Sequence, residues 1–222
     1  MMPKSKKILL LGAGGHCKSI IDTLFGLNIY EDIAIVEKKD VNSKHMLNED
    51  ILNIPIIGTD DDLEQLLSRG YKDAFISVGS FIDISIRKKL FNKIKTMGFN
   101  IPNIIDRTSI VSENAIIGEG NYVGKRAVIN VNAKLSNCTI INTGSIVEHD
   151  CNIEPFVHLA PGSILCGNVF IGEGTHVGAG SIIKQGIHVG NNTMIGMGSV
   201  VVKDIGSNKK AFGNPCKEVH YE

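Results

Sequence analysis

Hydrophobic residues recur with two different periods along this chain, and the period changes near residue 101. In the first part, short apolar runs of strand length alternate with stretches in which apolar residues have helical spacing. The apolar runs are at residues 6–12, 32–37, 54–58 and 73–80, and the helical stretches are at 16–27, 59–70 and 84–98. This alternation predicts an α/β domain over residues 1–100, in which helices pack on a small parallel sheet.

In the second part, every sixth residue from Ile105 to Val201 is Val, Ile or Leu, without a break. Small or β-branched residues mostly stand two positions earlier, and Gly recurs one position later. A period of six fits no helix and is the hexapeptide repeat of a parallel β-helix, in which three short strands and their turns make one triangular coil. Because side chains alternate along a strand, the aliphatic and the small residue both point into the coil. We therefore expect residues 101–222 to form about five coils without a long inserted loop.

Composition narrows the possible partners. Lys plus Arg equals Asp plus Glu in number, so the formal net charge is zero and no basic field indicates binding to nucleic acid. No apolar stretch approaches the roughly 18–20 residues of a membrane helix, and the first apolar run is too short for a signal peptide. The five cysteines are scattered without a CxxC motif, which indicates reduced thiols in the cytoplasm. No cluster of residues has metal-ligand spacing, so no metal is predicted.

One turn of the repeat carries candidate chemistry. Glu148, His149 and Asp150 follow the core position Val147, so His149 should lie at a corner of the coil and project outward. An imidazole has an unperturbed pKa of about 6.5 and can act as a general base, and a neighbouring carboxylate can fix its tautomer. From these residues alone, a solvated polar turn is the ordinary alternative.

A glycine-rich segment, GAGGH at residues 12–16, lies between the first predicted strand and the first predicted helix. Glycines there leave backbone N–H groups and a helix N-terminus open to a phosphate. The full G-x-G-x-x-G fingerprint is absent because residue 17 is Cys17, so NAD binding is not expected. A tight strand-to-helix turn without a ligand is the alternative.

Four motifs in a fixed order give a closer indication. They are GAGGH (12–16), NTGSIVEHDCNI (142–153), HLAPGS (158–163) and GNPCK (213–217). In these motifs and the repeat, the whole chain resembles bacterial nucleotide-sugar acetyltransferases of the UDP-4-amino-sugar N-acetyltransferase type, which act in bacillosamine synthesis, with the sialic acid O-acetyltransferases as close relatives. The resemblance implies a Rossmann-like first domain and a left-handed β-helix. It also implies a homotrimer with active sites between subunits, acetyl-CoA held between neighbouring β-helices, and a UDP-sugar held by the first domain.

The same resemblance implies roles for individual residues. His149 matches the general base, Asp150 the acidic residue that raises its basicity, and Asn142 a polar residue near the base. Acetyl-CoA contacts are implied at His158, Gly167, Ala179, Gly180 and Met197. Met197 departs from the family, which usually has a small residue there. UDP-sugar contacts are implied at Gly14, Gly15, His16, Glu37, Lys38 and Gly58.

The expected reaction is direct attack by the C4 amine of a UDP-4-amino-dideoxy sugar on acetyl-CoA, in bacterial surface-glycan biosynthesis. His149 is the expected base, and backbone donors stabilise the oxyanion. One alternative is O-acetylation of sialic acid or a related sugar, and GDP-perosamine-type substrates also stay open. Another is a non-catalytic β-helix scaffold, against which the EHD and HLAPG motifs count.

A β-helix carbonic anhydrase would need three metal-binding histidines. His158 and His176 are 18 residues apart and should stack one coil apart, but a suitable third histidine is missing. His176 is otherwise expected at the surface or in a cleft.

Overall fold

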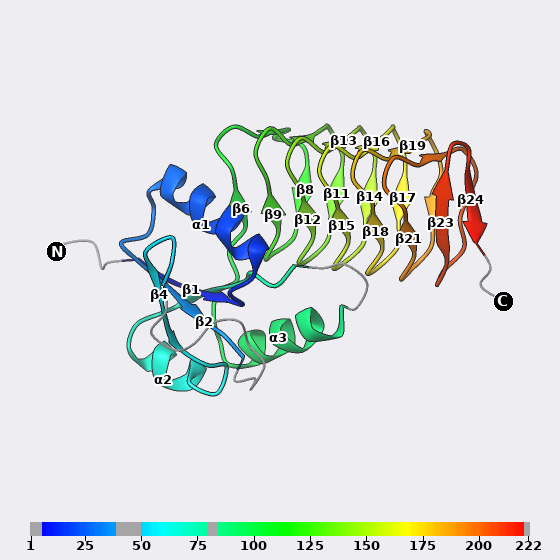
Figure 1. The fold of residues 1–222 in the computed structure, drawn as a ribbon. Helices are drawn as coiled ribbons and strands as arrows, with labels where there is room; N and C mark the ends of the chain where they lie inside the picture. The colour runs from blue at the N-terminus through cyan, green and yellow to red at the C-terminus, as the bar shows by residue number, and fades with distance from the viewer. Residues whose placement is uncertain (1–5, 39–49, 80–83, 220–222) are drawn as a thin grey trace. The chain divides into compact units, whose positions relative to one another are not determined.

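The computed structural model describes residues 6–38, 50–79 and 84–219, and the chain divides into two compact units (Figure 1). The first unit contains the described residues up to 79 together with 85–102. The second contains Ile84 and the described residues from Asn103 onward.

The first unit combines a five-stranded sheet with helices, in the alternating order that the sequence predicts. Its strands lie in the order β3-β4-β2-β1-β5, and every neighbouring pair is parallel except β3 and β4. The elements are β1 (Lys7–Leu11), α1 (Gly15–Leu27), β2 (Asp32–Val36), β3 (Asp50–Ile51), β4 (Ile54–Gly58), α2 (Leu63–Ser68), β5 (Asp73–Ile76) and α3 (Ser85–Thr96). The α/β prediction is confirmed. The antiparallel strand β3 was not predicted, because two residues are too few to show a period.

Strand β1 is central in this sheet, with β2 on one side and β5 on the other. Residues 8–11 of β1 are at most 1% exposed, as expected for a parallel strand that is covered on both faces. Ile20 and Leu24 of α1 are also buried. The loop between β1 and α1 therefore joins two well-anchored elements at the carboxyl edge of the sheet, where open α/β sheets bind their ligands.

The second unit is a parallel β-helix whose short strands recur every six residues and form three faces. The first face contains β6 (Ile104–Ile105), β9 (Tyr122–Val123), β12 (Ile140–Ile141), β15 (His158–Leu159), β18 (His176–Val177) and β21 (Met194–Ile195). The second face contains β7 (Ile110–Val111), β10 (Val128–Ile129), β13 (Ile146–Val147), β16 (Ile164–Leu165), β19 (Ile182–Ile183) and β22 (Val200–Val201). The third face contains β8 (Ile116–Ile117), β11 (Lys134–Leu135), β14 (Asn152–Ile153), β17 (Phe170–Ile171) and β20 (His188–Val189).

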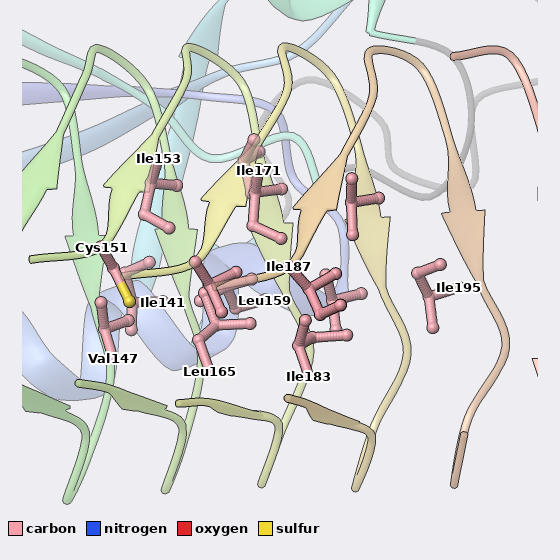
Figure 2. Packing of buried hydrophobic residues seen from close by; sticks show 14 of the residues in the cluster. Ile141, Val147, Cys151, Ile153, Leu159, Leu165, Ile171, Ile183, Ile187 and Ile195 are labelled. Atoms are coloured by element: carbon pink, nitrogen blue, oxygen red, sulfur yellow. The ribbon is translucent and has the colours of Figure 1, made fainter. Parts of the chain in front are cut away.

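The core of the β-helix has the register that the repeat predicts. Aliphatic side chains such as Val147, Ile153 and Leu159 are 0% exposed, and Figure 2 shows them pointing into the coil. The small residues two positions earlier are also buried. Their hydroxyls bond along the stack, since Ser163 Oγ donates to Ser145 Oγ at 3.3 Å and Ser145 Oγ donates to a backbone carbonyl at 3.0 Å. The coils run from residue 104 to residue 201 without an inserted loop, as expected.

The turns of the β-helix repeat as strictly as the strands. We call the turns between the first and second faces the first corner (for example 142–145) and those between the second and third faces the second corner (for example 148–151). At every sixth position from Gly120 to Gly198, one turn residue has a positive φ. Asn, Asp and Gly adopt this left-handed conformation most readily, which explains their recurrence in the turns. Asp150, with φ of 61°, occupies one of these positions.

An antiparallel hairpin extends the first face beyond the last coil. It consists of β23 (Lys210–Gly213) and β24 (Cys216–Val219), and β23 pairs in parallel with β21. The hairpin covers one open edge of the β-helix, which would otherwise be free to pair with another chain. It was not predicted as a pair of strands, although the GNPCK motif spans its turn.

Candidate active site

His149 and Asp150 form a hydrogen-bonded pair at the second corner, between β13 and β14. Asp150 Oδ2 lies 2.8 Å from His149 Nδ1, and about half of each side chain is exposed. Hydrogen bonds from His149 and from Asn132 hold the pKa of the Asp150 carboxyl below its ordinary value. When Nδ1 donates its proton to this carboxylate, Nε2 is left as a proton acceptor, which is the arrangement of a general base with its orienting acid.

Neighbouring coils pack directly against this pair. Gly167, one coil further on, lies so close to the His149 ring that a Cβ atom there would be 2.5 Å from both Cε1 and Nε2. Asn132, one coil earlier, donates from Nδ2 to Asp150 Oδ1 at 3.2 Å. Asn132 was not among the predicted site residues. Subtracting the 18-residue coil period from Asp150 would have found it.

Asn142 lies at the first corner and contacts His158 instead of His149. Its Nδ2 atom is 3.3 Å from His158 Nε2. The His158 ring also packs edge-on against His176 at 4.8 Å between centroids, so the predicted stacking of these two histidines is confirmed. His176 is not a surface residue, because it is only 8% exposed, and burial lowers its pKa.

The predicted acetyl-CoA residues are divided between the two corners. Ala179, Gly180 and Met197 follow Asn142 along the first corner, and the Met197 side chain is 81% exposed. Gly167 alone shares the second corner with His149. Corresponding turn residues of the two corners, such as Gly144 and Asp150, are six residues apart along mostly extended chain, so the corners are separated by on the order of 15–20 Å. One chain therefore does not bring the two groups of residues together.

The first unit has a cavity of about 250 Å³ at the carboxyl ends of its strands. Glu37 and Lys38 line it together with apolar side chains that include Leu11, Val36 and Val78. The cavity thus lies beyond the ends of β1, β2 and β5, and two of the predicted UDP-sugar residues face it. Apolar walls with a few charged groups are typical of small-molecule sites.

The glycine-rich loop connects the end of β1 to the N-terminus of α1. Gly14 and Gly15 are exposed, and a Cβ atom at either would meet nothing within 4 Å, so there is room for a ligand close to the backbone. The N–H of Ala13 donates to the Glu37 carboxylate, which ties the loop to the end of β2. His16 is half-buried in the first turn of α1.

Gly58 has a local structural reason to be glycine. A Cβ atom there would be 2.9 Å from a carboxylate oxygen of Asp62, which accepts the N–H of Thr59 at 2.8 Å. Gly58 is buried and does not line the cavity described above. The structure therefore explains Gly58 through the turn before α2, and its predicted contact with the nucleotide stays a prediction.

Within the described ranges, no group of three or more His, Cys, Asp or Glu side chains is arranged to hold a metal ion. No helix among these residues is both long enough and apolar enough to cross a membrane.

Comparisons with known proteins agree with this architecture. Residues 7–94 match the family model of the PglD N-terminal domain. Perosamine N-acetyltransferase from Caulobacter crescentus, in complex with CoA and GDP-perosamine, is 32% identical, with a TM-score of 0.90 and 97% of both chains covered. That structure is of a variant in which one histidine is replaced by asparagine.

Two further relatives differ in how much of their length this chain covers. The acetyltransferase domain of PglB from Neisseria gonorrhoeae is 33% identical, with a TM-score of 0.89. The match includes 97% of this chain and 100% of that domain. The same domain has been solved in complex with acetyl coenzyme A. The uncharacterized protein L142 of Acanthamoeba polyphaga mimivirus is 31% identical over 134 residues, which are 60% of this chain but 24% of the viral protein.

The fold, the paired histidine and carboxylate, and these comparisons define an acyltransferase of the hexapeptide β-helix class. More narrowly, the chain belongs to the family of acetyl-CoA-dependent nucleotide-sugar N-acetyltransferases that carry a PglD-type N-terminal domain.

Proposed function

We propose that this protein transfers the acetyl group of acetyl-CoA to the C4 amine of a UDP-4-amino-dideoxy sugar, in the cytoplasm, for a bacterial surface glycan. The observation that carries the proposal is the His149–Asp150 pair, with 2.8 Å between Nδ1 and Oδ2 and with the ring on an exposed corner. An amine that attacks a thioester must lose a proton, and a neutral imidazole accepts one near neutral pH.

In the proposed reaction, the amine nitrogen attacks the thioester carbon and its proton passes to His149 Nε2. Asp150 stabilises the imidazolium that forms, and backbone N–H groups stabilise the oxyanion. The carbon–sulfur bond then breaks, the new amide remains on the sugar, and the proton on His149 passes to the departing CoA sulfur. This sequence needs neither an acyl-enzyme nor a metal.

The substrates are assigned to separate parts of the chain. Acetyl-CoA contacts are proposed at His158, Gly167, Ala179, Gly180 and Met197. Asn142 is proposed to act beside His158, with which it forms a side-chain hydrogen bond. The sugar nucleotide is proposed to contact Gly14, Gly15, His16, Glu37, Lys38 and Gly58. The cavity that Glu37 and Lys38 line supports the second assignment, and the free space above Gly14 and Gly15 leaves room for a diphosphate.

A homotrimer is proposed because the outward positions of the second face are aliphatic on every strand. These residues are Ile110, Val128, Ile146, Ile164, Ile182 and Val200. Ile110 is 67% exposed and Ile182 is 39% exposed, so the stripe is accessible to a partner chain. A continuous apolar stripe of this kind indicates an interface. A second copy of the chain is the occupant that would also bring the first corner of one subunit to the second corner of the next.

The proposal is tested by CoA thiol release from the purified protein with three acceptors. These are a UDP-4-amino-dideoxy sugar, the corresponding GDP-sugar and free sialic acid. Release with the UDP-sugar is expected. Release with the GDP-sugar alone would move the substrate toward that of the Caulobacter relative, which was solved with GDP-perosamine. Release with sialic acid alone would overturn the N-acetyltransferase assignment.

A further inference from the structure

Three successive coils meet at the His149–Asp150 pair, and their backbones are bonded in series. Asp150 N donates to Val131 O of the preceding coil at 3.1 Å. Asn168 N, in the following coil, donates to His149 O at 2.8 Å. The pair is therefore held between two neighbouring turns of the second corner. The preceding turn contributes the side-chain amide of Asn132, which contacts Asp150. The following turn contributes Gly167, which lies against the His149 ring.

The preceding coil holds the carboxylate. Asn132 Nδ2 donates to Asp150 Oδ1 at 3.2 Å, while Oδ2 is 2.8 Å from His149 Nδ1, so each oxygen has its own partner. Asp150 faces a groove of about 400 Å³, whose lining includes Asn132 and Lys134. In this open setting, water competes with His149 for the carboxylate. Without the second hydrogen bond from Asn132, the carboxylate would be freer to turn away from the ring. The amide of Asn132 fixes the rotation of the carboxylate.

The following coil sets the position of the ring. A Cβ atom at Gly167 would be 2.5 Å from Cε1 and Nε2 of His149 and 3.2 Å from Cδ2. The backbone of Gly167 has no positive φ, so its conformation does not itself require glycine. The requirement comes from the imidazole, whose Nε2 edge lies directly against the Gly167 backbone.

We propose that Asn132 and Gly167 are positioning residues for His149. Asn132 acts by holding the Asp150 carboxylate, and Gly167 acts by having no side chain where the His149 ring lies. The proposal rests on the proposed role of His149 as the base. Asn132 sets the orientation of the imidazole through its Nδ1 side, and Gly167 sets where Nε2 lies. Gly167 would have this role in addition to any contact of its backbone with acetyl-CoA.

Asn132→Gly tests the first half, because glycine keeps the left-handed turn (φ 59°) and removes only the amide. We expect kcat to fall about tenfold with little change in KM, since orientation is lost and binding is kept. In an Asp150→Ala background, the same change should cost nothing further. The control is Asn192→Gly, at an exposed left-handed turn of a different corner (φ 50°), which should keep full activity. A loss that persists without Asp150 would overturn this role.

Gly167→Ala tests the second half. Moving the ring by about 1 Å should lower kcat roughly a hundredfold. Gly206→Ala is the control, because its Cβ atom would meet its nearest neighbour at an ordinary 3.6 Å. In a His149→Ala background, Gly167→Ala should cause no further loss. A raised KM for acetyl-CoA with unchanged kcat, still present without His149, would show that Gly167 only admits the cofactor and would overturn its positioning role.

Crystal structures of the two variants test the positioning without a substrate. The Asp150 carboxylate should turn in Asn132→Gly, and the His149 ring should move in Gly167→Ala. Side chains that stay in place would overturn the proposal even if the wild-type protein is active. Conversely, a wild-type protein that acetylates no amino sugar would refute the proposed function, while the crystal structures would still decide the positioning.

Discussion

His149 and Asp150 are adjacent in the chain, and their side chains meet with 2.8 Å between Nδ1 and Oδ2. Adjacent residues in a regular strand point to opposite sides, so this contact depends on the turn. The left-handed conformation of Asp150 (φ 61°) directs its carboxylate back toward the ring.

Replacing His149 by alanine should abolish most of the activity without unfolding the protein. The side chain is about half exposed, so His149→Ala should have nearly the melting temperature of the wild type. Turnover should fall by about 10²-fold or more, the usual contribution of a general base. Steady-state kinetics with saturating acetyl-CoA measure this loss. A variant with full turnover would remove His149 from the mechanism.

Much of the β-helix could be predicted from the sequence, because a period of six fixes both the strands and the side chains that point inward. Ile105 begins a register that holds to Val201, and the structure keeps it throughout. The turn at His149 could also be located in this way. The pairing of β3 could not, because its two residues carry no periodic signal.

Contacts between coils were harder to predict than contacts along the chain. The bond between Asn132 and Asp150 joins residues one coil apart, and a search for linear motifs does not compare them. Asn142 was expected near the base because it matches a polar residue of the resembling family, and within one chain it contacts His158 at the other corner of the second face. The way in which corners of different subunits meet depends on the assembly, which the order of residues does not specify.

Mixed trimers should recover activity that neither variant has alone. His149 and His158 flank opposite corners of the second face, so an interfacial site would take one from each subunit. Both His149→Ala and His158→Ala homotrimers should be impaired. Each trimer that contains both chains should recover one of its three sites, because a cyclic trimer pairs each first corner with a neighbour's second corner.

The measurement is thiol release from trimers formed by co-expression of the two differently tagged chains and purified through both tags. Trimers of each variant, mixed after assembly without exchange, are the control. If co-expressed trimers recover nothing, the site must lie within one chain and the proposed interface is wrong.

Adjacent residues of β19 should respond very differently to a buried charge. Ile183 is 0% exposed and points into the coil, so Ile183→Asp should cost more than about 4 kcal/mol and prevent folding. Ile182 points outward and is 39% exposed, so Ile182→Asp should leave the chain folded but weaken the proposed trimer. Circular dichroism and light scattering separate the two effects. Equal behaviour of the two variants would contradict the register.

Burial of His176 should make the protein less stable in mild acid. Its pKa is lowered in the folded protein, so the unfolded chain binds a proton first as the pH falls below about 6.5. Stability is therefore full above that pH and declines below it, by at most about 1.4 kcal/mol per pH unit for one group. His176→Met should flatten this decline between pH 7 and pH 5 in thermal melts.

The matched control for this experiment is His188→Met, because His188 is exposed and its ring stacks on Phe170 at 4.3 Å. It should leave the pH dependence of the melting temperature nearly unchanged. If both variants flatten the decline equally, burial of His176 is not its cause.

The central claim, acetyl transfer to an amine, is tested most directly with two acceptors that differ at one atom. The purified protein is given acetyl-CoA and a nucleotide sugar with either an amine or a hydroxyl at C4, and the acetylated product is measured by mass spectrometry. We expect an N-acetyl product from the amine, formed at least about 10²-fold faster than any product from the hydroxyl. Equal or faster acetylation of the hydroxyl sugar would contradict the claim.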